Sequence, residues 1–247
     1  MDASGALLHV VEERGDCYAR LTTMKMVLDY RFWRAEEEMS KNCRIPRQCA
    51  IDYSAILSAA PTSGVANTLL FLQESLPSLW RDAYLKTTPH QPNLARLCYG
   101  SFEYICDIYS DLEAKGEVAY DQTVQDRVVA AFGISGGTGP VNARRSPRWI
   151  NPDENLAVTE RDHGHLIANC MGGSGLDLNV FSQDRRLNRG RSEQGRVYRQ
   201  MERYCSQHSG TFCFSRPIYV DSTCVPRWIE FGVLRDDQTM WVKRFDN

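Results

Sequence analysis

A glycine-rich stretch, GISGGTGP at residues 133–140, divides this 247-residue sequence into two unlike parts. Four glycines and a closing proline in eight residues are typical of a linker or a sharp domain boundary. Residues 1–140 hold 13 Lys and Arg against 18 Asp and Glu, a net charge of −5, whereas residues 141–247 hold 16 against 13, a net charge of +3. We therefore expect an acidic domain at 1–133, a linker at 134–140 and a basic domain at 141–247.

The first part has apolar residues at helical spacing, which predicts a mainly α-helical domain of four to six helices. Pro77 is expected to begin one of them, with Ser75 or Ser78 near its cap. Such stripes are typical of a hydrophobic core rather than of a cofactor site, so no function is predicted for this part. The stripes are Leu21, Met24, Leu28 and Phe32; Cys98, Phe102, Ile105, Tyr109 and Leu112; and Val124, Val128 and Phe132, the last ending at Gly133.

The second part mixes short β-prone runs with one clear helix. The helix is expected over residues 192–207, with Ser192 placed to cap it, and a hairpin is expected to turn at Asp236 and Asp237. The fold class predicted for the whole chain is therefore α+β, with an antiparallel sheet in the second part. The expected strands are residues 157–161, 165–169, 178–183, 211–220 and 227–234, with the hairpin spanning 235–245.

Composition narrows the class of protein further. Hydrophobic residues make up 43% and charged residues 24% of the chain, which is typical of a soluble globular protein, and no run is apolar for long enough to span a bilayer. The first residues lack a basic region and acquire Glu12, Glu13 and Asp16 too early for a signal peptide. Nine cysteines without a CxxC pair argue against a zinc ribbon and leave free thiols or one or two disulfides as alternatives.

The stretch DHGHLIANCMGGSG at 162–175 places two histidines on either side of a glycine and then becomes glycine-rich. Phosphodiester hydrolysis needs a base for water, a cation to stabilise negative charge and positive groups to hold the substrate. A histidine, with an ordinary pKa of about 6.5, suits the base, and either His163 or His165 could serve. Asn188, expected at the start of a helix, suits magnesium, which prefers oxygen ligands and keeps most of its waters.

Seven arginines lie within the 19 residues 185–203, where Glu193 and Glu202 are the only acids. An isolated run of this kind is typical of a solvated helix face. Its position beside the histidines and Asn188 instead favours binding of a polyanion such as nucleic acid, because arginine presents a planar fork that fits phosphate.

Five segments in this order, DHGHLIAN, GGSG, LNVFSQ, LNRG and QME, resemble the DNA/RNA non-specific endonuclease family. That family has a ββα-metal fold and a DRGH motif, and the resemblance covers about residues 141–247. It implies a metal-dependent endonuclease that hydrolyses phosphodiester bonds of DNA, with RNA as a further substrate. The cofactor implied is Mg²⁺, with Mn²⁺ as the alternative, and no membrane segment is implied.

The resemblance also assigns roles to single residues. His165 becomes the general base, because it takes the last place of the four-residue motif, and Asn188 becomes the magnesium ligand. Asn179 matches the asparagine that supports the site, and Asp162 is read as a carboxylate that orients neighbouring groups. Glu202 matches a helical glutamate near the waters of the metal. Its rival is Glu193, because Glu202 lies 14 residues beyond Asn188.

Five further residues are expected to contact the substrate. His163 stands where the family usually has a phosphate-binding arginine. Either Arg161 or Arg148 is expected to replace that arginine, or a protonated His163 takes over part of its role. The full substrate-binding set is His163, Arg161, Arg186, Arg189 and Gln183, and the turn before the strand is expected to be formed by Gly172, Gly173 and Gly175.

Several alternatives remain open at this stage. Both histidines could instead hold a transition metal with Cys170 or His208, or serve only in packing. A degenerate nuclease fold could bind nucleic acid without cutting it, and a housekeeping or nutritional nuclease would look similar. An acidic domain before a nuclease and the lack of a leader are also the organisation of a bacterial toxin effector, which is exported by a dedicated secretion system and paired with an immunity protein. The helical part at 1–133 would then be an adaptor or loading domain.

Overall fold

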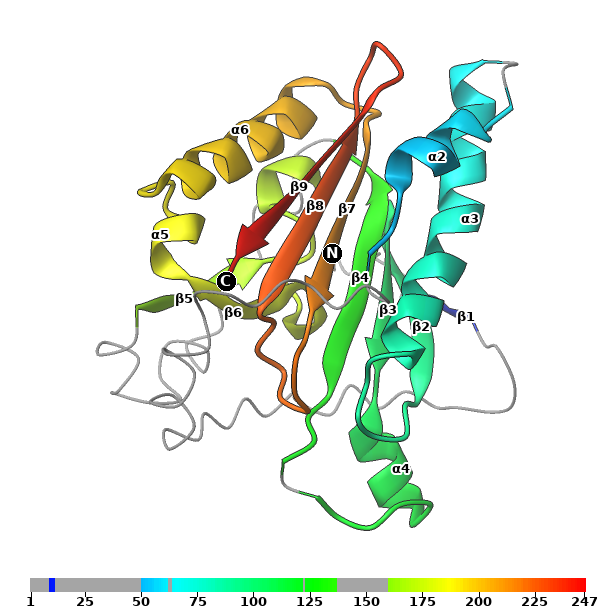
Figure 1. The fold of residues 1–247 in the computed structure, drawn as a ribbon, viewed down its shortest axis with the longest axis vertical. Helices are drawn as coiled ribbons and strands as arrows, with labels where there is room; N and C mark the ends of the chain where they lie inside the picture. Colours follow the sequence, from blue (N-terminus) through cyan, green and yellow to red (C-terminus); the bar gives the residue numbers. More distant parts are fainter. Residues whose placement is uncertain (1–8, 12–49, 62–63, 122, 137–159) are drawn as a thin grey trace, which may run out of the picture.

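The computed structural model describes residues 9–11, 50–61, 64–121, 123–136 and 160–247. Its centre is a seven-stranded antiparallel sheet, in the order β1-β2-β3-β4-β7-β8-β9, and a separate two-stranded antiparallel sheet pairs β5 with β6 (Figure 1). The fold class is α+β, as the sequence predicts. The strands are β1 His9–Val11, β2 Leu94–Tyr99, β3 Phe102–Asp107, β4 Arg127–Ile134, β5 Arg161–His165, β6 Val180–Asp184, β7 Phe212–Ile218, β8 Trp228–Leu234 and β9 Met240–Asp246.

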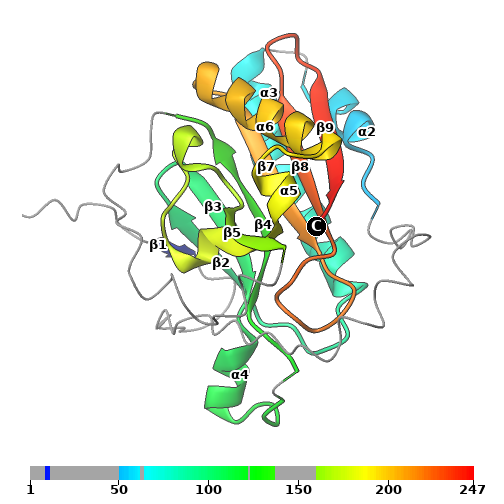
Figure 2. The ribbon, with the colours of Figure 1, turned by 90° about the vertical axis from the view of Figure 1, so that its left-hand side faces the viewer.

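Helices cover the two faces of the large sheet. Figure 1 shows α2 and α3 on one face, and Figure 2 shows β5, β6, α5 and α6 in front of the opposite face. The helical elements are α2 Tyr53–Ser58, α3 Val65–Leu85, α4 Tyr109–Lys115, α5 Arg185–Asn188 and α6 Glu193–Gln207, with 3-10 turns η4 at Asn169–Met171 and η5 at Asp177–Asn179.

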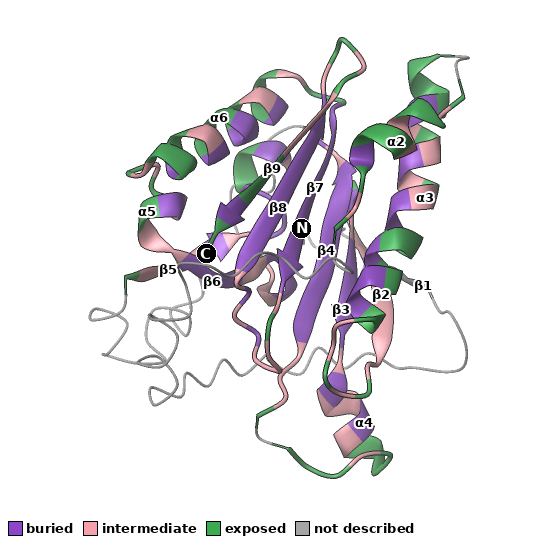
Figure 3. Ribbon diagram, viewed as in Figure 1, coloured by how far each residue is buried: buried purple, intermediate pink, exposed green. Residues whose placement is uncertain are grey.

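The large sheet is buried on both sides, as the colouring of its central strands in Figure 3 shows. Successive side chains of a strand point to opposite faces. Phe102 and Tyr104 of β3 accordingly join the core beneath β5, β6 and α6, whereas Ile105 joins the core beneath α2 and α3. Full burial of an aromatic or aliphatic side chain stabilises a fold by about 1.5–3 kcal/mol, so both layers add to the rigidity of the sheet.

The helical stripes expected between residues 98 and 133 are wrong. Residues 94–107 form β2 and β3, only 109–115 are helical, and 127–134 form β4. The helix-like spacing arose because apolar residues of a strand buried on both faces occur at every position, so some of them fall three and four residues apart. The stripe from Leu21 to Phe32 lies outside the described residues.

The predicted boundary at 133–140 does not separate two independent units in the described chain. β4 ends at Ile134 and pairs with β7, so that Ile134 lies opposite Phe212 and Ala131 lies opposite Ser215. Strands from both sides of the glycine-rich stretch therefore form one sheet, and the described parts of the expected domains share their cores.

Pro77 does not begin a helix, because it lies inside α3. Proline costs a helix about 3 kcal/mol in an interior position, but Pro77 is buried between Leu76 and Trp80, which lie in the core against the sheet. Packing thus offsets a local signal for a helix start.

Several predictions for the second part are confirmed. Ser192 caps α6, its hydroxyl accepting a hydrogen bond from the amide of Gly195 at 2.9 Å. Strands β7 and β8 lie within the predicted runs, and the chain turns between β8 and β9 at Asp236 and Asp237. The run at 165–169 is not a strand, because β5 ends at His165 and η4 begins at Asn169.

The six cysteines among the described residues are free thiols, and four of them are buried: Cys106, Cys205, Cys213 and Cys224. In the described ranges of the chain, no helix is long and apolar enough to cross a membrane.

Candidate active site

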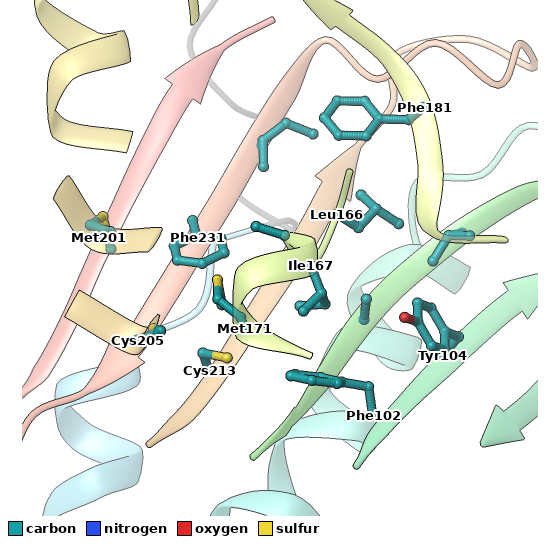
Figure 4. Close-up of a cluster of buried hydrophobic side chains, with 14 of the residues drawn as sticks. Phe102, Tyr104, Leu166, Ile167, Met171, Phe181, Met201, Cys205, Cys213 and Phe231 are labelled. Atoms are coloured by element: carbon teal, nitrogen blue, oxygen red, sulfur yellow. The ribbon is translucent and has the colours of Figure 1, made fainter. Parts of the chain in front are cut away.

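A ββα unit lies on one face of the large sheet, formed by β5, β6 and the short helix α5. The two strands pair so that Asp162 lies opposite Gln183 and His165 lies opposite Val180. Phe181 of β6 and Leu187 of α5 anchor the unit in the core. Figure 4 shows Phe181 and Leu166 in that cluster, together with Met171, Met201 and Phe231 from η4, α6 and β8. The unit therefore rests on a packed base.

Gly164 allows the two strands of the unit to close over a buried side chain. A Cβ atom at residue 164 would lie 2.0 Å from Oε1 and 2.5 Å from Cβ of Gln183. Gln183 itself is only 1% exposed. The side chain of Gln183 fills the space that the missing side chain of Gly164 leaves. The expectation that Gln183 contacts the substrate stays a prediction.

Asp162 is the centre of a polar cluster between β5 and α5. Its carboxylate accepts hydrogen bonds from Nε of Arg189 at 2.7 Å, Nη2 of Arg189 at 2.9 Å and Nε of Arg185 at 3.2 Å. The side-chain nitrogen Nδ2 of Asn188 donates to the same carboxylate at 3.1 Å. Asp162 thus orients Arg185 and Asn188 of α5 and also Arg189, the residue that follows α5.

The charge on Asp162 is stabilised by these partners. Burial alone raises the pKa of the carboxyl, but hydrogen bonds from Arg189, Asn188 and Arg185 outweigh it and hold the pKa below the ordinary value. Asp162 is therefore ionised at neutral pH and can only accept hydrogen bonds. Asn188 must turn its amide nitrogen toward Asp162, which turns its oxygen Oδ1 away from that carboxylate.

Asn188 is the last residue of α5 rather than the first residue of a helix, which corrects the expectation. Asp184 caps the start of α5, since its side chain accepts a hydrogen bond from the amide of Leu187 at 2.7 Å. The beginning of α6 packs closely behind, where a Cβ at Gly195 would lie 2.6 Å from the carbonyl oxygen of Arg186. The position of Asn188 is therefore fixed from both ends of α5.

His163 and His165 lie on one face of β5, together with Arg161, because residues two apart in a strand share a face. Asp162 lies on the opposite face. Arg161 donates through Nη1 to the carbonyl oxygen of Ser182 at 3.2 Å. The backbone oxygen of His165 accepts a hydrogen bond from the hydroxyl of Tyr198 at 3.5 Å, which ties the end of β5 to α6.

The loop between β5 and β6 is held by Asn179, which is fully buried. Its Oδ1 accepts from the amide of Ile167 at 2.9 Å, and its Nδ2 donates to the carbonyl oxygens of Ile167 at 2.8 Å and Ser174 at 2.6 Å. Asn179 lies in η5, and its polar atoms all serve the backbone, so it positions the loop and does not touch a substrate. Gly172 adopts a left-handed φ of 94° in the same loop, as expected of a turn glycine.

Glu202 lies on the inner face of α6. Its carboxylate pairs with Nη1 of Arg199 at 2.8 Å. Burial raises the pKa of Glu202, and the pairing with Arg199 opposes that rise. Among the hydrogen bonds and ion pairs of the described residues, neither Glu202 nor Glu193 contacts Asp162 or Asn188. The choice between these two glutamates stays a prediction.

The arginines of 185–203 divide into two groups. Arg185 and Arg189 hold Asp162, although the side chain of Arg189 remains 46% exposed beside Asn188. The other arginines expose their side chains along α5 and α6. Among them, Arg199 pairs with Glu202 rather than with Asp162. The exposed arginines of this surface are Arg186, Arg189, Arg191, Arg196, Arg199 and Arg203.

Sequence reasoning missed two contributors to this site. Arg185 was counted only as part of a basic run, and Asp184 was not recognised as a helix cap. An aspartate before RRLN is a capping signal that could have identified the start of α5. The contact of Arg185 with Asp162 had no local signal, because 23 residues separate them in the chain.

The donor set at Asn188 fits a hard divalent cation. The amide oxygen of Asn188 is a hard ligand of the kind that Mg²⁺ prefers, and one such ligand is enough for an ion that keeps most of its waters. No group of three His, Cys, Asp or Glu side chains suited to a metal occurs in the part of the chain that the structure describes, so the site with His163, His165 and a further Cys170 or His208 is not assembled there.

The hairpin, α5 and the polar cluster at their junction define an α+β protein with a nuclease-type ββα unit. Residues 126–232 match the model of the DNA/RNA non-specific endonuclease family. The match runs from β4 into β8 and contains the whole Asp162 cluster. The protein is therefore a nuclease that hydrolyses nucleic acid.

Solved structures and curated proteins were compared as well. The Sda1 nuclease with bound zinc ion is 14% identical, with 60% of this chain and 69% of that chain covered and a TM-score of 0.32, a score too low to support any inference. No curated protein matches the chain.

Proposed function

We propose that this protein is a divalent-metal-dependent endonuclease that cleaves both DNA and RNA, with His165 as general base and Asn188 as the ligand of Mg²⁺. Mn²⁺ can take the place of Mg²⁺. The observation that carries the proposal is the hydrogen bond from Nδ2 of Asn188 to Asp162, because it directs Oδ1 of Asn188 toward a cation. Both nucleic acids share the phosphate backbone that such a site acts on.

His165 removes a proton from the attacking water in this proposal. A neutral imidazole can accept that proton near neutral pH. Its place at the end of β5 is supported by the hydrogen bond from Tyr198 to its backbone and by Asn179, which holds the next turn of chain. The cation supplies positive charge that stabilises the phosphate and the leaving oxygen.

The exposed arginines of α5 and α6 hold the substrate. Arg196, Arg199 and Arg203 are spaced by three and four residues, so they form one stripe along the outer face of α6. Arg186 and Arg189 extend the surface toward Asn188, and Arg161 and His163 contribute from β5. Contacts of this kind neutralise phosphates without reading bases, which fits a nuclease without sequence preference.

Cleavage of plasmid DNA and of a structured RNA, with and without EDTA, tests the proposal. We expect both substrates to be cut in Mg²⁺ or Mn²⁺ and to remain whole in EDTA. A gel shift with complete retention of both substrates in Mg²⁺ would instead identify a nucleic-acid-binding module on a degenerate nuclease fold.

For the biological role, we propose a bacterial toxin effector rather than a housekeeping or nutritional nuclease. The acidic net charge of residues 1–140, next to the basic net charge of residues 141–247, is the feature from which this role is proposed. A cognate immunity protein is the implied partner, and the implied destination is a target cell. Expression in a bacterial host should arrest growth, and coexpression of the product of a neighbouring reading frame should restore it; normal growth in both cytoplasmic and periplasmic expression would contradict this role.

A further inference from the structure

Asn247, the residue after β9, is buried and fully engaged beside the ββα unit. It is 7% exposed. Its Nδ2 donates to the carbonyl oxygens of Ser182 at 3.0 Å and Pro226 at 2.7 Å, and its Oδ1 accepts from the amide of Asp184 at 2.9 Å. One side chain therefore satisfies three backbone groups, two on β6 and one before β8.

The contact with Asp184 lies at a critical junction. Asp184 is the last residue of β6 and also the cap of α5, because its carboxylate accepts from the amide of Leu187. Asn247 holds the amide of Asp184 while the side chain of Asp184 holds the first turn of α5. The direction of this four-residue helix, and so of Asn188 at its end, depends on the junction that Asn247 fixes.

The preceding residue ties the second helix to the same strand end. Asp246 accepts from Nε2 of Gln194 at 2.9 Å, and its amide donates to Oε1 of Gln194 at 2.9 Å. Gln194 lies in the first turn of α6. Consecutive residues at the end of β9 thus hold β6, α5 and α6 against the large sheet, although β5 and β6 share no strand pairing with it.

We propose that Asn247 is a positioning residue of the nuclease site: by bridging Ser182, Pro226 and Asp184, it sets the junction of β6 and α5 and thereby the orientation of the carboxamide of Asn188. This inference rests on the proposed function, since Asn188 matters as a metal ligand there. Loss of a partner outside the direct ligands lowers metal affinity or activity by about 10–100-fold in metal sites generally.

The test compares Asn247→Ala with a matched asparagine on the other side of the sheet. Asn93 donates through Nδ2 to the carbonyl oxygen of Ile108 at 2.9 Å and to Asp111 at 3.2 Å, remote from α5, so Asn93→Ala controls for the loss of asparagine hydrogen bonds. If Asn247→Ala fails to fold, Asn247→Ser replaces it, because its shorter polar side chain keeps a hydroxyl group but cannot bridge all three backbone partners.

Two readouts are measured on the full chain. The Mg²⁺ concentration for half-maximal cleavage should rise about tenfold or more in Asn247→Ala and stay at the wild-type value in Asn93→Ala. Hydrogen exchange of the amides of residues 185–188 should quicken in Asn247→Ala only. If Asn247→Ala keeps the Mg²⁺ requirement of the wild type, or if it keeps the exchange of the wild type, the inference is overturned.

Failure of the proposed function gives a different pattern. Wild-type protein that cuts neither DNA nor RNA in Mg²⁺ would overturn the nuclease proposal, and the exchange of residues 185–188 would then decide on its own whether Asn247 positions α5. Slower or unchanged exchange in Asn247→Ala contradicts that positioning whatever the activity.

Discussion

Two aspartates, one on each side of the large sheet, hold arginine-containing clusters in different ways. Asp162 has a side chain that is 14% exposed and binds Arg185, Asn188 and Arg189 at the surface of the ββα unit. Asp107 is fully buried on β3, where it accepts hydrogen bonds from Tyr84 at 2.5 Å and the amide of Asn93 at 2.7 Å and contacts Nε2 of His90 at 2.7 Å.

The buried cluster is closed, because its other members are also partnered. Arg127 donates through Nε to the hydroxyl of Tyr84 at 2.8 Å and through Nη2 to Nδ1 of His90 at 3.1 Å. In this arrangement Nδ1 of His90 accepts and Nε2 carries the proton that Asp107 accepts. Arg127 also donates through Nη1 to the backbone oxygens of Asp221 at 2.6 Å and Thr223 at 3.2 Å. The cluster around Asp107 thus joins α3 to β3 and β4.

The cluster around Asp162 differs because its partners reach the surface. Arg189 and Asn188 keep exposed atoms after binding the carboxylate, which leaves them able to meet a cation or a phosphate. The comparison teaches that a satisfied and sealed cluster stabilises a fold, whereas a cluster that orients exposed groups builds a site. We therefore expect changes in the Asp107 cluster to lower stability and changes in the Asp162 cluster to lower activity.

The largest effect is expected for His165→Ala. Removal of a general base lowers the rate by about 10²–10⁴-fold. DNA binding and the unfolding transition should stay close to those of the wild type, because the side chain is proposed to act on water alone. Single-turnover cleavage and gel shifts measure both properties; an unchanged cleavage rate would remove His165 from the role of base.

Asp107→Ala should mainly affect stability. Removal of the carboxylate leaves the hydroxyl of Tyr84 and Nε2 of His90 buried without the acceptor that they bind, and each such unsatisfied group costs about 1–3 kcal/mol. Urea unfolding measures the free energy, and cleavage per folded molecule should remain near the wild-type value. If Asp107→Ala lost cleavage but kept its stability, the cluster around Asp107 would belong to the active site and would not be structural.

Asp162→Ala should have the opposite profile. Cleavage is expected to fall by about 10–100-fold, since Asn188 loses the partner that orients it. Stability should change by only about 1 kcal/mol or less, because the ion pairs of Asp162 are open to solvent. Equal losses of stability in Asp162→Ala and Asp107→Ala would show that the two clusters contribute equally to the stability of the fold.

The smallest effect is expected for Asp107→Asn, in how the free energy of unfolding falls at acidic pH. Burial alone raises the pKa of Asp107, but hydrogen bonds from His90, Tyr84 and the amide of Asn93 outweigh it and hold the pKa below its ordinary value. A carboxyl with a lowered folded pKa contributes stability above its unfolded pKa of about 3.9 and loses it as pH falls toward the folded value. Between pH 5 and pH 3, Asp107→Asn should therefore lose less stability than wild type; equal losses would contradict the pairing.

The residues that meet around Asp162 could be predicted in part from sequence, because they lie within one short order of motifs. Asp162 and Asn188 are 26 residues apart, yet a strand, a turn and a strand bring them together. The burial of Gln183 could not be predicted, because periodicity does not say which polar residue of a half-buried hairpin points inward. Only the packing against Gly164 decides that.

The first part of the fold could not be predicted in the same way. Cys98, Phe102 and Ile105 have helical spacing, but they belong to strands whose two faces are both covered. Whether a strand is covered on both faces depends on α3 and on α6, which lie far away in the sequence. Asn247 was overlooked for the same reason, since its partners are 21–65 residues distant.

Metal binding by Asn188 is the central claim, and one titration tests it most directly. Mn²⁺ is titrated into the His165→Ala chain and into the double variant that also carries Asn188→Ala, and bound metal is counted by electron paramagnetic resonance. We predict one bound Mn²⁺ for the first chain and a loss of that binding in the second. Equal binding by the two chains would contradict the account.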